Sequence, residues 1–407
     1  MFIHLTRIMA KVHGNLSINL CLFFFTLVEV LGFTIILPLF PYLTKDIMSP
    51  VEVGYLSASN ALCQMIATPI MGSLSDKYGR RPLLLLSVAS TFISFLILAN
   101  AETRFWFFFS RILDGLLGGN LALARAYVTD VTTDDKEARL QGMGIIGSAY
   151  GFGHVLGPIL GGLLLSYHHG APGYASAIIS LLNLVCLWFF LPESLPLEKR
   201  CKKSIIIFSF GQTLSDLFRI CGTNTKIMEI LMTRYTFTFI LVLFQYSFTF
   251  FNAKNDPRTA GLLLCWFSLV YSLSQSYGTG ILLRRIDERS LFRYTINIQP
   301  FCYAILYATR TNGQMFISLV PLALTSGILN TMINLRTSAE LEKVPGIVGG
   351  GLGLSSAVGS LARMIAPPSA GFFIQYMTDS CTLFLYCAFF STLLLLTMFN
   401  QMREILL

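Results

Sequence analysis

Charge is scarce in this sequence. Only 12% of the 407 residues are Asp, Glu, Lys or Arg, whereas 54% are hydrophobic and the mean hydropathy is +0.66. A soluble protein of this length could not hide that much apolar surface in its core. The composition therefore excludes an ordinary soluble domain and indicates a chain that crosses a membrane many times.

The sequence also lacks the residue patterns that carry common enzymatic chemistry. It has no glycine-rich nucleotide loop, no cluster of metal ligands and no Ser, His and Asp set suited to nucleophilic catalysis, so we expect no enzyme. Its nine cysteines include no Cys-x-x-Cys pair, and we expect free, packed thiols. The net charge of +8 is expected from basic cytoplasmic loops and not from nucleic-acid binding.

Long apolar runs follow one another along the chain. At about 20 apolar residues per span, they predict twelve transmembrane helices, near 16–39, 53–74, 82–100, 104–127, 140–165, 173–191, 228–251, 259–283, 291–309, 313–335, 345–375 and 380–402. We therefore predict an all-α polytopic membrane protein in two six-helix bundles. The N-terminal bundle would occupy residues 1–191, a cytoplasmic linker 192–227 and the C-terminal bundle 228–407.

The distribution of basic residues predicts the orientation. With the N-terminus inside, 21 of the 29 Lys and Arg residues fall in cytoplasmic segments and 5 on the opposite side. Basic residues collect on the cytoplasmic side of membrane proteins, so we expect both termini in the cytoplasm. The membrane itself stays open between the plasma membrane and that of an intracellular organelle.

The segment Gly72–Pro82 reads as a tight charged turn between the second and third predicted helices. It holds one acid, three bases and two glycines. Such a cluster either anchors the topology or acts as a latch whose ion pairs form in one conformation only. Asp76 favours the latch, because bases alone suffice for anchoring. The candidate gating residues are Gly72, Asp76, Gly79, Arg80 and Arg81, with Arg363 of the eleventh predicted helix as a possible partner.

Glycines at four-residue spacing mark the fifth predicted helix. Gly153, Gly157 and Gly161 fall on one face, where they would allow close packing against another helix. Gly162 extends this small-residue segment, and Pro158 bends the span by removing a backbone hydrogen bond. The segment serves either as simple tight packing or as a pivot that seals a pathway against leak.

Charged residues inside predicted spans are the best pointers to function, because each costs at least about 2.5 kcal/mol at mid-bilayer. Glu29 stands alone in the first span, where a carboxyl that gains and loses a proton near neutral pH could couple transport to protons or contact a cationic substrate. Arg111 and Asp114 either form a structural pair on one helix face or belong to the same cavity. Arg363 is either the partner of an acid such as Asp76 or a contact for an anionic substrate.

Polar and aromatic residues of the seventh predicted helix are weaker candidates. Gln245 and Tyr246 could line a cavity for an amphipathic organic molecule.

Several motifs resemble those of the major facilitator superfamily. The run Gly72-x-Leu-Ser-Asp-Lys-x-Gly-Arg-Arg81 resembles its loop signature between helices two and three, and Gly153-x-x-x-Gly-Pro-x-x-Gly-Gly162 resembles the fifth-helix motif of its drug and proton antiporters. Glu29-x-x-Gly with Pro38 and Pro41 resembles the tetracycline-transporter branch, where an aspartate usually stands at the Glu29 position. Arg111-x-x-x-Gly115 resembles the fourth-helix arginine motif, from which Asp114 departs. Leu191–Arg200 and Ala138–Met143 are most similar to eukaryotic tetracycline-transporter-like members.

The resemblance implies a secondary active transporter that works by alternating access. We expect it to exchange a small organic, drug-like or organic-ion substrate against protons, with a proton gradient and no bound cofactor. Its partners would be the substrate, protons and the lipid bilayer, and it would act as a monomer without nucleic acid. The alternatives are a uniporter or proton symporter of an organic solute, and a transport-inactive receptor or scaffold with the same fold.

Overall fold

The structure is a computed structural model. It describes residues 14–117, 120–131, 136–195, 198, 200, 225–252, 256–309, 311–342, 348–376, 384, 386–389 and 391–392. Within these residues the regular secondary structure is helical and contains no strand. Most of the predicted twelfth span and of the predicted linker lies outside this part of the chain.

The helices of the first half follow the predicted spans closely. They are α2 (Gly14–Ile36), η1 (Leu37–Leu39), α3 (Phe40–Leu43), α4 (Pro50–Tyr78), α5 (Arg80–Ala99), α6 (Arg104–Leu117), α7 (Asn120–Val131), α8 (Lys136–Leu165) and α9 (Ala171–Phe190). The first predicted span continues through η1 and α3, where Pro38 and Pro41 tighten the helix. The fourth predicted span, 104–127, is described as α6 and α7 on either side of residues 118–119.

The second half adds α11 (Thr225–Asn252), α12 (Pro257–Leu273), the π-helical turn η3 (Ser274–Gly278), α13 (Thr279–Leu283), α14 (Glu288–Ala308), α15 (Asn312–Glu342) and α16 (Val348–Tyr376). Within the described residues, seven helical segments are long and apolar enough to cross a bilayer. They are Leu22–Leu43, Arg80–Ala99, Gly144–Leu165, Ala171–Phe190, Lys226–Asn252, Asn312–Thr337 and Ala357–Tyr376.

The charged turn at Gly72–Pro82 is much shorter than predicted. The helix α4 continues through Tyr78 and α5 begins at Arg80, so Gly79 alone separates them. Charged residues at a membrane surface are hydrated, and they permit both helices to extend beyond the apolar spans. The charge cluster therefore lies mainly on helix ends and not on a loop.

Contact density divides the chain into two compact units, which we call unit 1 (Met1–Leu37 and Ile66–Ile206) and unit 2 (Pro38–Met65 and Ile207–Leu407). The boundary thus falls inside α4, whose first part groups with the second half of the chain. The division into bundles at 1–191 and 228–407 stays a prediction.

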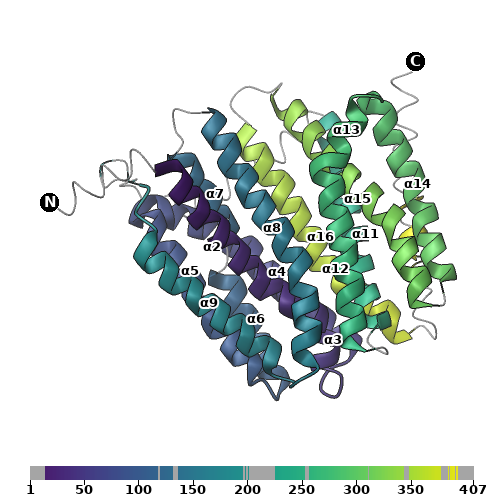
Figure 1. The fold of residues 1–407 in the computed structure, drawn as a ribbon, viewed down its shortest axis with the longest axis horizontal. Helices are drawn as coiled ribbons and strands as arrows, with labels where there is room; N and C mark the ends of the chain where they lie inside the picture. Colours follow the sequence, from purple (N-terminus) through teal and green to yellow (C-terminus); the bar gives the residue numbers. More distant parts are fainter. Residues whose placement is uncertain are drawn as a thin grey trace. The chain divides into compact units, whose positions relative to one another are not determined.

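In unit 1, α2 is the central helix and packs along α8 and α9 (Figure 1). Serine and asparagine side chains of α9 hold it by bonding to its backbone: Ser176 Oγ donates to the Gly32 carbonyl at 2.9 Å, and Asn183 Nδ2 to the Phe25 carbonyl at 3.2 Å. Buried side chains such as Leu84, Val88 and Tyr127 complete the apolar core. These polar bonds fix the position of α2, the helix that carries Glu29.

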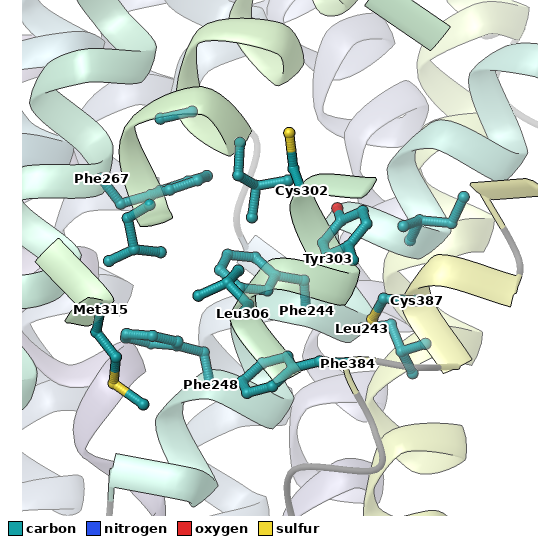
Figure 2. Close-up of a cluster of buried hydrophobic side chains, with 14 of the residues drawn as sticks. Leu243, Phe244, Phe248, Phe267, Cys302, Tyr303, Leu306, Met315, Phe384 and Cys387 are labelled. Atoms are coloured by element: carbon teal, nitrogen blue, oxygen red, sulfur yellow. The ribbon is translucent and has the colours of Figure 1, made fainter. Parts of the chain in front are cut away.

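Unit 2 has an aromatic core, shown in Figure 2. The ring of Phe244 on α11 contacts Phe267, Tyr303 and Phe384, with centroids 5.3, 5.7 and 6.1 Å away. Along another side of this unit, α11 packs against α16 (Figure 1). These contacts leave the centre of unit 2 filled with rings and apolar chains.

The first part of α4 packs closely within unit 2. A Cβ at Gly54 would lie 2.6 Å from the Pro367 carbonyl oxygen of α16, so only glycine fits there. Tyr246 Oη of α11 donates a hydrogen bond to the Pro50 carbonyl at 3.0 Å, and Tyr42 Oη donates to the Asn252 carbonyl at 2.7 Å. Backbone contacts thus bind residues 38–65 to α11 and α16.

The predicted span 259–283 contains one irregular turn. At η3 the Thr279 N–H donates to the Ser274 carbonyl, five residues earlier, in place of the usual four. Ser274 Oγ also donates to the Leu324 carbonyl of α15 at 2.7 Å, and a Cβ at Gly327 of α15 would lie 2.7 Å from the Tyr271 carbonyl oxygen. The π-helical turn therefore lies where α12 and α15 are in close contact.

Candidate functional site

Gly79 joins α4 to α5 in a conformation that other residues rarely adopt. Its φ is +107°, the one positive φ among the described residues. A Cβ at this position would also collide with the carboxylate of Glu193 and lie 2.8 Å from Nη2 of Arg200. Glycine is required here both for the backbone angle and for the close approach of Glu193.

Arg80 is the centre of a charge cluster in unit 1. Its Nη2 lies 2.6 Å from Asp76 Oδ1, and its Nε donates to Asp130 Oδ2 at 2.9 Å. A further guanidinium nitrogen donates to Ser75 Oγ. The Arg80 side chain is only 10% exposed. One arginine therefore ties the end of α4 to α5 and to the end of α7.

Glu193, just after α9, extends this cluster. Its Oε1 accepts from the backbone N–H of Arg80 at 2.8 Å and from that of Leu195 at 3.1 Å, while its Oε2 lies 3.5 Å from Arg200 Nη2. The first of these bonds satisfies a backbone donor in the first turn of α5. Ser194 Oγ completes the link by donating to Asp130 at 3.3 Å.

The charge cluster contains partners that we did not predict from the sequence. The pair Asp76–Arg80 follows from their four-residue spacing, but Asp130 and Glu193 are 50 and 113 residues from Arg80. The sequence shows only that Asp130 and Glu193 are acids at the predicted cytoplasmic ends of apolar spans. The latch role of the cluster, and a pairing of Asp76 with Arg363, stay predictions, because Asp76 and Arg363 belong to different units.

Arg111 and Asp114 form an ion pair inside unit 1. Arg111 Nη1 lies 3.6 Å from Asp114 Oδ2, and Nη2 donates to Ser94 Oγ of α5 at 2.9 Å. The guanidinium group also lies over the ring of Phe95, 5.3 Å from its centroid. Arg111 is only 2% exposed, so the pair holds a deeply buried cation. This supports a structural part in the packing of α5 against α6.

Glu29 lies near the same layer of unit 1. It precedes Gly32 by three residues on α2, and a Cβ at Gly32 would lie 3.1 Å from the ring of Phe95, the ring that carries Arg111. Although Glu29 is half-buried as a residue, its Oε2 atom is fully buried. One turn of α2 therefore carries the Glu29 carboxyl group, and the next turn, at Gly32, lies against the Phe95 ring.

The fifth predicted helix, α8, packs against α2 through its glycines. A Cβ at Gly153 would lie 2.7 Å from the side chain of Val30, and one at Gly157 would overlap the side chain of Thr34. Thr34 Oγ1 donates to the Gly153 carbonyl at 2.9 Å. Gly161 and Gly162 are also buried, and Pro158 lies within the helix. The glycine segment is thus a close helix contact, and its role as a pivot stays a prediction.

The candidates of unit 2 occupy separate places. Tyr246 donates its hydroxyl hydrogen to Pro50, and Gln245 is half-buried one residue earlier. Arg363 is exposed on α16, and its Nη2 donates to Ser360 Oγ at 2.9 Å.

Arg81 in unit 1 donates to the carbonyl of Trp188. Among the described residues, no group of three His, Cys, Asp or Glu is placed to hold a metal ion.

The comparison with known sequences identifies the family. The profile of the Major Facilitator Superfamily matches residues 22–255. The tetracycline resistance protein of class C from Escherichia coli is 28% identical over 321 residues, which cover 77% of this chain and 79% of that protein. Major facilitator superfamily domain-containing protein 10 of Bos taurus is 33% identical over 204 residues, covering 43% of this chain and 44% of the relative.

Solved structures share the fold. The human organic anion transporter MFSD10 (TETRAN) matches with a TM-score of 0.69 at 20% identity, covering 93% of this chain and 98% of that one. The nucleoside transporter NupG matches with a TM-score of 0.72 at 14% identity, covering 96% and 99%. The all-α transporter fold predicted from the sequence is thereby confirmed. The chain therefore belongs to the major facilitator superfamily and moves a small organic solute across a membrane.

Proposed function

We propose that the protein exchanges a drug-like or anionic organic solute against protons, and that Glu29 is the group that takes up and releases the proton. The observation that carries the proposal is a carboxyl group with a fully buried oxygen inside a membrane-spanning helix of unit 1. An ionisable group at such a place is costly and is retained where it serves transport. Protonation removes the charge, so the free energy of Glu29 in the bilayer changes with each proton.

The surroundings of Glu29 suit this role. The helix α2 is held by backbone-directed bonds from α9 and by the glycine contact with α8, so Glu29 lies on a fixed support. Arg111 lies over the Phe95 ring, next to Gly32, and its charge is offset by Asp114. The proton site proposed here is therefore Glu29, while the Arg111–Asp114 pair supports the helices around it.

The relatives favour transport of an organic solute. Tetracycline resistance proteins and an organic anion transporter are among the proteins that this chain resembles. We further propose that the protein works as a monomer with both termini in the cytoplasm. The excess of Lys and Arg on the predicted cytoplasmic side supports this orientation.

The test is transport by the purified full-length protein in proteoliposomes. A panel of organic anions and cations is offered with and without an imposed pH gradient, and internal pH is followed with an entrapped dye. We expect the gradient to drive solute movement and Glu29→Gln to abolish both that drive and the solute-dependent pH change. If Glu29→Gln transports at the same rate with the same pH dependence, the assignment is wrong.

Glu52→Gln is the matched control. Glu52 lies at the start of α4, where its Oε2 accepts from the Ser49 N–H at 2.7 Å and the Glu52 N–H donates to Ser49 Oγ at 3.4 Å. This reciprocal pair is a capping box, and glutamine preserves it. The same substitution outside the proposed proton site should therefore leave the pH dependence unchanged.

A further inference from the structure

Two arginines from different helices of unit 2 meet around one glycine. Arg234 lies on α11 and Arg363 on α16, and both belong to segments apolar enough to cross the membrane. The position that a Cβ of Gly359 would take is 3.7 Å from Arg363 Nη1 and 3.9 Å from Arg234 Nε. Because Gly359 has no side chain, there is room for a methyl-sized group next to both guanidinium groups.

Neutral side chains orient these two cations. Arg234 donates through Nη1 to Asn334 Oδ1 of α15, and Arg363 donates through Nη2 to Ser360 Oγ, one turn earlier on α16, at 2.9 Å. An amide and a hydroxyl oxygen accept these hydrogen bonds and fix the direction of each guanidinium group. Three helices of the same unit thus contribute to the arrangement.

The burial of the two groups differs in a way that suits a binding site. The Nε atom of Arg234 is fully buried, whereas Arg363 is exposed on its helix. An arginine exposed within a membrane span is costly against lipid and is expected to face water. The arrangement therefore has one cation fixed in the protein and one on a face that an aqueous solute can reach.

Both guanidinium groups would attract an anion placed next to Gly359. The planar fork of a guanidinium group matches the oxygens of a carboxylate, sulfonate or phosphate and binds them through paired hydrogen bonds. Two forks from different helices would bind an acidic group more selectively than either one alone.

We propose that Arg234 and Arg363, oriented by Asn334 and Ser360 around Gly359, bind the acidic group of the substrate, which is therefore an organic anion. The inference rests on the transport of an organic solute proposed above, but not on its coupling to protons. A competing arrangement has an acid of the protein, such as Glu229 on α11, neutralise the two arginines.

The experiment compares two probes of the same shape and different charge. Naphthalene-2-sulfonate and the neutral naphthalene-2-sulfonamide are titrated into the purified full-length protein in detergent, and affinity is measured by calorimetry. We expect the wild-type protein to bind the sulfonate at least about tenfold more tightly than the sulfonamide. Arg234→Gln and Arg363→Gln should each remove about tenfold or more of the affinity for the sulfonate and leave the sulfonamide within about twofold.

Two further variants separate binding from folding. A Cβ at Gly359 makes only ordinary van der Waals contacts, so Gly359→Ala should fold normally, yet its methyl group occupies the space proposed for the anion. We expect it to weaken sulfonate binding. Arg285→Gln removes an exposed arginine from the turn after α13 and should change neither affinity.

The outcomes are distinct. A wild-type protein without preference for the sulfonate, or arginine variants that lose both probes equally, overturns the anion site. A preference that is unchanged in Arg234→Gln but rises in Glu229→Gln would also overturn it, because the acid of the protein and not a bound anion then neutralises the arginines. Glu29→Gln should keep the sulfonate preference even where proton coupling is lost, so failure of the anion site and failure of the proton assignment can be told apart.

Discussion

Replacing Gly79 with alanine tests how much the junction between α4 and α5 depends on glycine. The backbone there has a φ of +107° and a ψ of 157°, a region that is almost closed to residues with a Cβ. The new methyl group would also displace the Glu193 carboxylate, which accepts from the Arg80 N–H at 2.8 Å and lies 3.5 Å from Arg200. Backbone strain and a lost polar contact therefore act together.

The magnitude follows from these two contributions. Strain in this backbone region costs about 1–3 kcal/mol. Losing a hydrogen bond to a charged acceptor costs about 1.5–3 kcal/mol, and the ion pair with Arg200 adds little because the side chains of Arg200 and Glu193 are 21% and 25% exposed. We expect Gly79→Ala to lower the free energy of unfolding by about 2.5–6 kcal/mol.

The assay is reversible unfolding in mixed micelles with increasing sodium dodecyl sulfate, followed by tryptophan fluorescence. Gly72→Ala is the control, because a Cβ at Gly72 meets nothing within 4 Å and the residue is helical, so this variant should be as stable as the wild-type protein or more so. In Gly79→Ala/Glu193→Ala the methyl group no longer collides with a carboxylate. The double variant should thus be less destabilised than the sum of the two single variants.

Two results would refute this reasoning. Equal stability of Gly79→Ala and the wild-type protein would show that the junction does not need glycine. Strict additivity with Glu193→Ala would show that the close approach of Glu193 contributes nothing, and that only the backbone angle matters.

Three further changes test other parts of the structure. Gly157→Ala should destabilise the protein by about 1–3 kcal/mol because its methyl group overlaps α2, whereas Gly147→Ala on the same helix meets nothing and should be neutral in the same unfolding assay. Arg111→Gln should cost about 3–5 kcal/mol by leaving a buried acid, and adding Asp114→Asn should recover part of it. The Asp287 carboxylate accepts a hydrogen bond from the Ser290 N–H in the first turn of α14, and this bond lowers the pKa of the carboxyl. The resulting stabilisation is present above pH about 4 and is lost as the pH falls through the lowered pKa. In Asp287→Asn the free energy of unfolding should therefore fall less steeply at acid pH.

Local sequence rules predicted the helices and the short-range pairs. Apolar runs set the spans, and the three- and four-residue spacings in Arg111–Asp114 and Asp76–Arg80 put each pair on one helix face. Contacts that depend on how distant helices pack could not be predicted in this way. Arg80 bonds to Asp130, 50 residues later in the chain. Arg234 and Arg363 both lie near Gly359, although they are also far apart in the sequence.

The extent of α4 and α5 shows a second limit. Hydropathy reports where a helix is apolar and not where it ends, so it places Ser75–Tyr78 in the charged turn, although they form the last turn of α4. Residues 38–65 group with unit 2 through close backbone contacts such as that of Gly54 with Pro367. A single glycine in the sequence does not indicate which helix it will contact.

The π-helical turn at Ser274–Gly278 affects how substitutions and deletions in this region should be interpreted. Each residue of an α-helix advances by about 100°, and a wider turn of this kind accommodates one residue more than the regular helix would hold. A helical wheel drawn without a break from 257 to 283 would therefore assign Thr279–Leu283 to the wrong face. Losing one residue inside η3 could be absorbed by a return to regular helix, whereas the same loss in α12 would rotate every later side chain by about 100° about the helix axis. Among natural variants of this helix, length changes should concentrate at η3.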